Sequence, residues 1–70
     1  MTLSARNHLK GTIEEIQQLG DVLAHVTVRV GEDSLIESVI TRRSAEEMGL
    51  KKGDSVTAVV KATEVMIAKP

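Results

Sequence analysis

The sequence contains no cysteine and no aromatic residue among its 70 residues. Without cysteine there is no disulfide and no thiolate zinc site, and two isolated histidines are too few for an ordinary structural metal cage. A chain of this length buries only roughly 60% of the surface that its unfolded form exposes, so its stability as a monomer is marginal. We therefore expect one domain, residues 1–70, that gains stability by oligomerisation.

An excess of charge of one sign is also missing, since nine Lys and Arg stand against ten Asp and Glu. The net charge of −1 provides no field to hold DNA or RNA, and no aromatic ring is present on which a base could stack. No apolar run approaches the roughly 20 residues needed to span a bilayer, and the N-terminus lacks the apolar stretch of a secretory signal. The sequence thus predicts no nucleic-acid partner, no membrane span and a cytoplasmic location.

Five segments have the composition of β-strands. Residues 22–30 alternate Val or Ala with mostly polar positions, which is typical of a half-buried strand. Residues 9–17 form a second candidate, whose interrupted alternation suggests a bulge. Residues 34–41 carry apolar side chains on both faces, as expected where one face meets the core and the other a partner chain. Two further strands are expected at residues 55–63 and 64–68, and Met48 and Met66 are interpreted as core residues.

One short helix is predicted between the third and fourth strands. Ser44 and Glu47 have the spacing of a capping box, with Ser44 at the N-cap. The helix can run only to about Met48, because Gly49 is suited to a left-handed C-terminal cap. Five strands with a helix in this position predict an all-β fold, the OB-fold-like five-stranded Greek-key barrel.

Catalysis is disfavoured by the distribution of titratable residues. The acidic residues fall mostly in turns and on polar faces, and His8 and His25 lie on different segments. No nucleophile-elbow spacing is present. We therefore expect a protein that is not an enzyme and has no catalytic residue.

Basic residues near hydroxyls are candidates for holding an anion. Arg42 and Arg43 directly precede Ser44, the predicted start of the helix. The alternative is that Ser44 only caps the helix with Glu47 while both arginines are solvated.

A second candidate lies near the N-terminus, where Ser4 and Arg6 would project to the same side of an extended segment. The alternative is a frayed terminus over residues 1–6. Lys61, late in the fourth predicted strand, is a third candidate, and the alternative is an ordinary solvated lysine.

Several segments together resemble the molbindin, or Mop, family of small cytoplasmic molybdate-binding proteins. The resemblance covers about residues 3–68 and is carried by Ser4-Ala5-Arg6-Asn7, Leu9-Lys10-Gly11, Val39-Ile40-Thr41, Ser44-Ala45, Met48-Gly49-Leu50 and the run from Val60 to Ala68. Related modules sense molybdate in transcription regulators and accompany the ATPases of molybdate importers. Neither a DNA-binding nor an ATPase segment is attached here, so the resemblance implies a free-standing binding protein.

The resemblance implies an OB-like barrel that assembles into a hexamer, a trimer of dimers, with molybdate or tungstate bound between subunits. The matching positions are Ser4, Ala5, Arg6 and Lys61 from one chain and Thr41, Ser44 and Ala45 from another. It implies a role in molybdenum storage and homeostasis, and the alternative is a ligand-sensing module that acts on a partner protein. The metal would be bound only as its oxyanion, with no metal ligated directly by side chains.

These residue types suit a tetrahedral dianion, whose four oxygens are all hydrogen-bond acceptors. Arg6 and Lys61 can neutralise the charge, while hydroxyls and backbone N–H groups donate to the remaining lone pairs. An older label for the family invokes a molybdenum-pterin cofactor, but no aromatic side chain is present to pack against a pterin. We therefore expect free oxyanion as the ligand and no organic cofactor.

Overall fold

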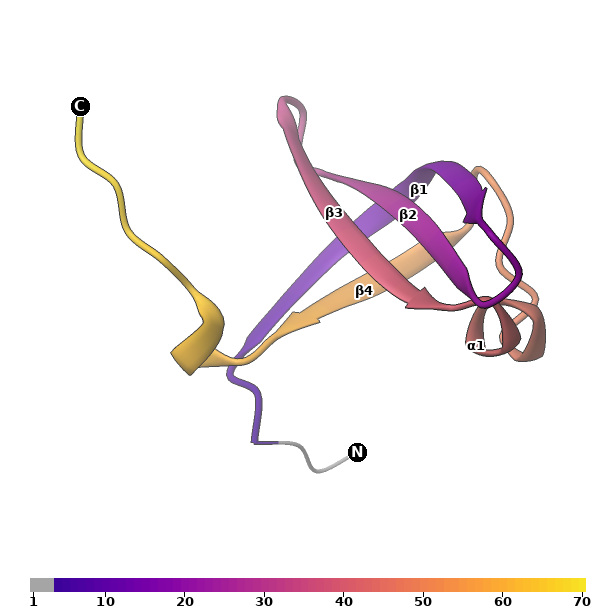
Figure 1. The fold of residues 1–70 in the computed structure, drawn as a ribbon. Coiled ribbons are helices and arrows are strands. Elements are labelled where there is room, and N and C mark those ends of the chain that lie inside the picture. Colours follow the sequence, from indigo (N-terminus) through magenta and orange to yellow (C-terminus); the bar gives the residue numbers. More distant parts are fainter. Residues whose placement is uncertain (1–3) are drawn as a thin grey trace.

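The computed structural model describes residues 4–70, and in them four strands form one curled antiparallel sheet of order β3-β2-β1-β4 (Figure 1). A short helix, α1, follows β3, and a single 3-10 turn, η1, follows β4. The bounds are β1 Asn7–Leu19, β2 Leu23–Val30, β3 Ser34–Thr41, α1 Arg42–Glu47, β4 Ser55–Val60 and η1 Ala62–Glu64. The expectation of an all-β fold with one short α-helix between the third and fourth strands is confirmed. No helix in this part of the chain is long and apolar enough to cross a membrane.

Strand β1 is the element that makes the sheet curl, because it pairs with β4 through its first half and with β2 through its second. Its register with β2 shifts between Ile13 and Glu15, so the predicted bulge is confirmed. Gly11 lies where the strands approach most closely, and a Cβ there would stand 2.5 Å from the carbonyl oxygen of Arg29. Only glycine permits that approach without a shift of the backbone.

The core is small and lies where β1 crosses β2. Ile13 is 1% exposed, and the buried residues around it are Ala24, Val26 and Val28 of β2. These three valine and alanine positions confirm the predicted alternation within residues 22–30. Ile16, Val30, Ile40, Leu50 and Val56 pack partly buried against this cluster. Leu50 reaches it from the turn after α1, which is how the helix region is tied to the sheet.

The predicted fifth strand is not found. Residues 62–64 form η1, and the segment beyond it is exposed and pairs with no strand. The expected five-stranded Greek-key barrel is therefore a four-stranded open sheet in the single chain. Met66, interpreted from sequence as a core residue, is 93% exposed, and Met48 is also exposed. The apolar composition of residues 65–67 had suggested a strand, but a strand also needs a neighbour that supplies hydrogen bonds.

The predicted capping box is wrong in register. The N-cap is Thr41, whose backbone is extended and whose Oγ1 accepts a hydrogen bond from the Ser44 backbone N–H at 3.0 Å. The helix therefore begins at Arg42, three residues before the expected position. Glu47 does not reach back to a cap, because it pairs with Arg43 instead. The predicted left-handed glycine after the helix is confirmed, with a φ of 61° at Gly49.

Candidate functional site

The first group of predicted site residues lies where β1 begins and β4 ends. Asn7 and Val60 are register partners in the ladder between these strands, and the Asn7 Nδ2 group donates to the Val60 carbonyl oxygen at 3.2 Å. Continuing this antiparallel register by one position sets Arg6 opposite Lys61. The two cations that the sequence singled out separately are thus brought to the same end of the sheet.

Arg6 and Lys61 have no carboxylate partner among residues 4–70. The ion pairs in that range engage Arg29, Arg42 and Arg43, the other arginines of the chain, and His25. Both Arg6 and Lys61 are exposed. Two positive charges therefore lie near this end of the sheet without a carboxylate from the described residues to neutralise them.

Ser4 and Ala5 precede Arg6 in an irregular segment beside the same ladder. Ser4 is exposed and Ala5 is half-buried, and the Ala5 carbonyl oxygen lies 3.2 Å from the His8 Nε2 atom. This contact joins the irregular segment to the second residue of β1. Residues 1–3 of the segment for which a frayed terminus is the alternative lie outside the described part of the chain.

The second group, Thr41, Ser44 and Ala45, lies at the start of α1. The Thr41 hydroxyl donates to the Ser44 Oγ atom at 2.8 Å while accepting from the Ser44 backbone N–H. The Ser44 hydroxyl proton is therefore directed elsewhere and is free to donate to a ligand. Ser44 and Ala45 are half-buried, so this group presents one donor hydroxyl beside a partly shielded backbone.

Arg42 and Arg43 are not free to serve an anion in this arrangement. Arg42 pairs with Glu46 at 3.0 Å and Arg43 with Glu47 at 3.2 Å, in both cases one helical turn apart. The open hollow beside the two arginines is lined by Asp21 and Glu46 as well, and it includes neither Ser44 nor Ala45. Sequence reasoning missed these ion pairs, although the spacing of four residues between each arginine and its glutamate was a usable signal.

The two groups lie at opposite ends of β1. Thr41 pairs with Leu23, which pairs with Leu19 at the last position of β1, whereas Arg6 precedes its first position. Figure 1 shows α1 and the end of β4 on opposite sides of the molecule. β1 has 13 residues and is far longer than an oxyanion even though it curls, so no ligand of a few atoms can touch both groups of one chain.

The described residues also contain no cluster of His, Asp or Glu suited to hold a metal ion. The residues predicted from the sequence instead form two separate groups of hydrogen-bond donors. One group has two cations and the hydroxyl of Ser4, and the other has the hydroxyl pair at the start of α1.

Comparison with known proteins gives the family. The model of the TOBE domain matches residues 3–67. The chain is 45% identical to molybdenum-pterin-binding protein 2 of Clostridium pasteurianum over 67 residues, which cover 96% of this chain and 97% of that protein. The chain belongs to the molbindin family.

Solved structures of molbindins share the fold. A molybdate-binding protein from Sporomusa ovata superposes with a TM-score of 0.89 at 38% identity, covering 99% of this chain and all of that one. ModG, described as a cytoplasmic molybdate-binding protein and solved with molybdate bound, gives a TM-score of 0.82 at 44% identity. That match covers 89% of this chain and 43% of ModG. The names of these molbindins are those of binding proteins rather than enzymes.

Proposed function

We propose that this chain binds molybdate or tungstate, as the free oxyanion, at a site shared between two copies of itself. One copy supplies Ser4, Ala5, Arg6 and Lys61, and the other supplies Thr41, Ser44 and Ala45. The assembly is a hexamer, a trimer of dimers, and its role is molybdenum storage and homeostasis in the cytoplasm. The molybdate bound to ModG supports the ligand class.

The observation that carries the proposal is that Arg6 and Lys61 lie directly beside Asn7 and Val60, the last register pair between β1 and β4. Neither cation has a carboxylate partner among the described residues, and together they match the two negative charges of the ligand. The distance between the two groups within one chain supports a site completed by a second chain.

The donors present are sufficient for useful affinity. Hydrogen bonds to charged groups contribute about 1.5–3 kcal/mol each, and micromolar binding requires about 8 kcal/mol. The hydrogen bonds from two cations and from the hydroxyls of Ser4 and Ser44 would together contribute a free energy of that order. No carboxylate belongs to the set, so a ligand that must donate a proton, such as protonated phosphate, has no acceptor there.

Isothermal calorimetry with sodium molybdate tests the proposal on matched variants. Arg6→Ala and Lys61→Ala should each weaken binding by about tenfold or more, because each removes a charge-assisted hydrogen bond of about 1.5–3 kcal/mol. Lys10→Ala is the control, since Lys10 is an exposed lysine of β1 outside the proposed set. Light scattering of each variant shows whether the assembly is retained.

Three results would contradict the proposal. Wild-type protein that releases no heat with molybdate or tungstate would remove the ligand class. An affinity unchanged by Arg6→Ala or Lys61→Ala would remove that residue from the site. A loss of affinity in Lys10→Ala equal to the other two would show that binding depends on general positive charge alone.

A further inference from the structure

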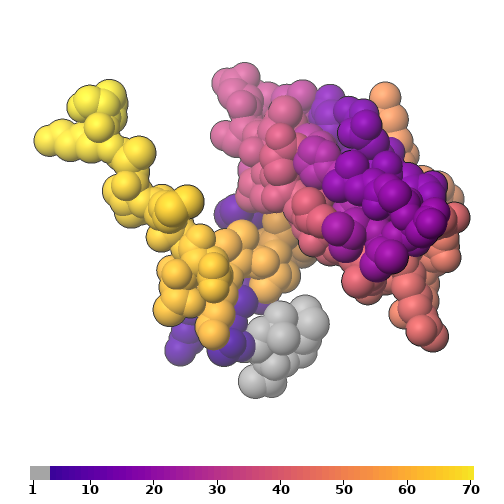
Figure 2. All heavy atoms as spheres, viewed as in Figure 1, coloured from indigo at the N-terminus to yellow at the C-terminus, as the bar shows by residue number. Residues whose placement is uncertain are grey.

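The start of β1 is tied to the end of β4 by a side chain as well as by the ladder between the two strands. The Asn7 Nδ2 group donates to the Val60 carbonyl oxygen at 3.2 Å, although the two residues are 53 positions apart in the sequence. Figure 2 shows the start of β1, in indigo, lying against the orange end of β4. The Val60 oxygen belongs to the planar peptide group that joins Val60 to Lys61. Asn7 therefore restricts the rotation of the peptide group from which Lys61 begins.

The backbone of Lys61 is held on its other side too. The Glu64 backbone N–H donates to the Lys61 carbonyl oxygen at 2.8 Å, at the start of η1. Both peptide groups that flank Lys61 thus have a hydrogen-bond partner, although the residue lies outside β4 and is exposed. The position of its backbone is therefore restricted, while its side chain extends into solvent where a ligand can reach it.

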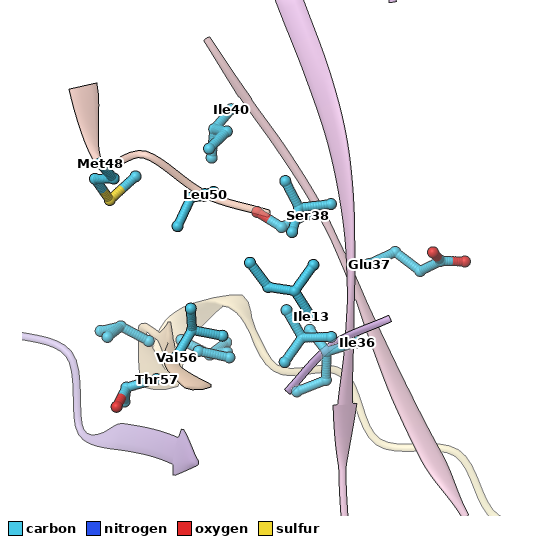
Figure 3. Close-up of a pocket in the computed structure, with 14 residues that line it drawn as sticks. Ile13, Ile36, Glu37, Ser38, Ile40, Met48, Leu50, Val56 and Thr57 are labelled. Carbon is cyan, nitrogen blue, oxygen red and sulfur yellow. The ribbon is translucent and has the colours of Figure 1, made fainter. Parts of the chain in front are cut away.

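The groove beside β4 offers Lys61 no negative charge that would fix it instead. This groove of about 260 Å³ is mainly apolar and is lined by residues of β3 and β4, including Val59 and Val60 just before Lys61. Among the described residues that line it, the one carboxylate is that of Glu37, and Figure 3 shows it pointing away from the space. The hydrogen bonds of the two flanking peptide groups are therefore the contacts that restrict Lys61.

Arg6 has an equivalent restraint, which comes from His8 of β1. The His8 Nε2 atom lies 3.2 Å from the carbonyl oxygen of Ala5, a half-buried residue. A carbonyl oxygen can only accept a hydrogen bond, so Nε2 carries the proton and donates. The Ala5 oxygen belongs to the peptide group that joins Ala5 to Arg6. Because Arg6 lies before the first residue of β1, this hydrogen bond restricts a cation that the strand itself does not include.

We propose that Asn7 and His8 are positioning residues of the oxyanion site. Asn7 holds the peptide group before Lys61, and His8 holds the peptide group before Arg6. Both cations are thereby placed before the ligand arrives, so less conformational entropy is lost when the anion binds. Each positioning residue acts through one cation, and neither belongs to the residues proposed to touch the anion. The inference rests on the proposed function and adds two residues that set the affinity of its site.

A double-mutant cycle, with affinity for sodium molybdate measured by isothermal calorimetry, tests the link between Asn7 and Lys61. Asn7→Leu removes the donor while keeping a similar side-chain volume, and it should weaken binding by about threefold to tenfold. In the Lys61→Ala background the same substitution should weaken binding by less than about twofold, because the residue that Asn7 positions has lost its amino group. A general structural role for Asn7 would give equal losses in both backgrounds, and that result would overturn the proposal.

Two substitutions at His8 test the restraint on Arg6. His8→Leu removes the donor and should weaken molybdate binding by about threefold to tenfold, whereas His8→Gln keeps an N–H donor and should stay within about twofold of the wild type. Since glutamine carries no charge, this recovery also excludes the charge of the imidazole as the cause. His25→Leu is the matched control, because His25 lies on β2 and contacts Glu37. Equal losses in the two His8 variants, or an equal loss in His25→Leu, would overturn the proposal.

A measurement without ligand separates this inference from the proposed function. Backbone order parameters from NMR relaxation report how firmly each amide group is held. Asn7→Leu should lower the value at Lys61 from about 0.85 toward about 0.6, while the value at Ile13 in the core stays unchanged and shows that the fold is retained. Wild-type protein that binds no molybdate would overturn both the proposed function and this inference. Molybdate binding together with a Lys61 order parameter that Asn7→Leu leaves unchanged would overturn the inference alone.

Discussion

Ile13 and Ile67 are the same residue type in opposite environments. Ile13 is 1% exposed at the crossing of β1 and β2, and its backbone is also tied to the turn before β4 by hydrogen bonds of 2.9 Å to Gly53 and Asp54. Ile67 is 90% exposed in a segment without strand partners. The same hydrophobicity therefore supports the fold of the single chain at one position and contributes little to it at the other.

The largest difference in stability is expected between two separate variants, in which Ile13 or Ile67 is replaced by alanine. Ile13→Ala should lower the free energy of unfolding by about 2–5 kcal/mol, because it leaves a cavity in the small core. Ile67→Ala should cost at most about 0.5 kcal/mol in dilute protein, because an exposed side chain loses few contacts when it is truncated. Thermal melts across a range of protein concentrations measure both. The comparison breaks down if Ile67→Ala destabilises dilute, monomeric protein as much as Ile13→Ala does.

A smaller effect on stability is expected from the N-cap residues of the two short helical elements, α1 and η1. Thr41 caps α1 through its side chain, whereas η1 has no side-chain hydrogen bond at its cap, Lys61. Thr41→Val should therefore cost about 0.5–2 kcal/mol of stability, and Lys61→Ala should cost almost none. Urea unfolding of the two variants measures the difference. Equal losses would show that the cap at Thr41 does not stabilise the body of the sheet.

The smallest effect is electrostatic and lies within the sheet. Arg29 donates two hydrogen bonds to the Glu14 carboxylate, and this contact lowers the pKa of Glu14 below its ordinary value of 4.5. A lowered folded-state pKa means that this stabilisation is present above the ordinary value and is lost as the pH falls through the folded-state value. We expect Arg29→Gln to return the pKa of Glu14 toward 4.5, as measured by NMR titration of its carboxyl carbon.

The control for this titration is Arg42→Gln, because Arg42 pairs with Glu46 on the helix and does not contact Glu14. It should leave the pKa of Glu14 where it is. A Glu14 pKa that does not respond to Arg29→Gln would show that the carboxylate owes its shift to something other than this contact.

The local pattern of the sequence was sufficient to predict most strands of the sheet. The alternation within residues 22–30, the bulge in the strand before it and the glycine turns are all consequences of side-chain periodicity and backbone freedom, which a sequence displays directly. Ser44 shows where local pattern falls short. Thr41 and Ser44, three positions apart, both have hydroxyls suited to an N-cap, and the extended backbone of Thr41 makes it the cap. The partners of Arg42 and Arg43 depended on that starting position.

The sequence alone determined which residue types suit an oxyanion and where most of the strands lie, because both follow from side-chain chemistry and spacing. The tertiary structure decided how these pieces are distributed in space. It set Arg6 and Lys61 beside the last register pair of β1 and β4, separated them from Thr41 and Ser44 by the length of β1, and left residues 65–68 outside the sheet. Register and distance depend on pairing between segments remote in the chain, and the sequence does not display that pairing.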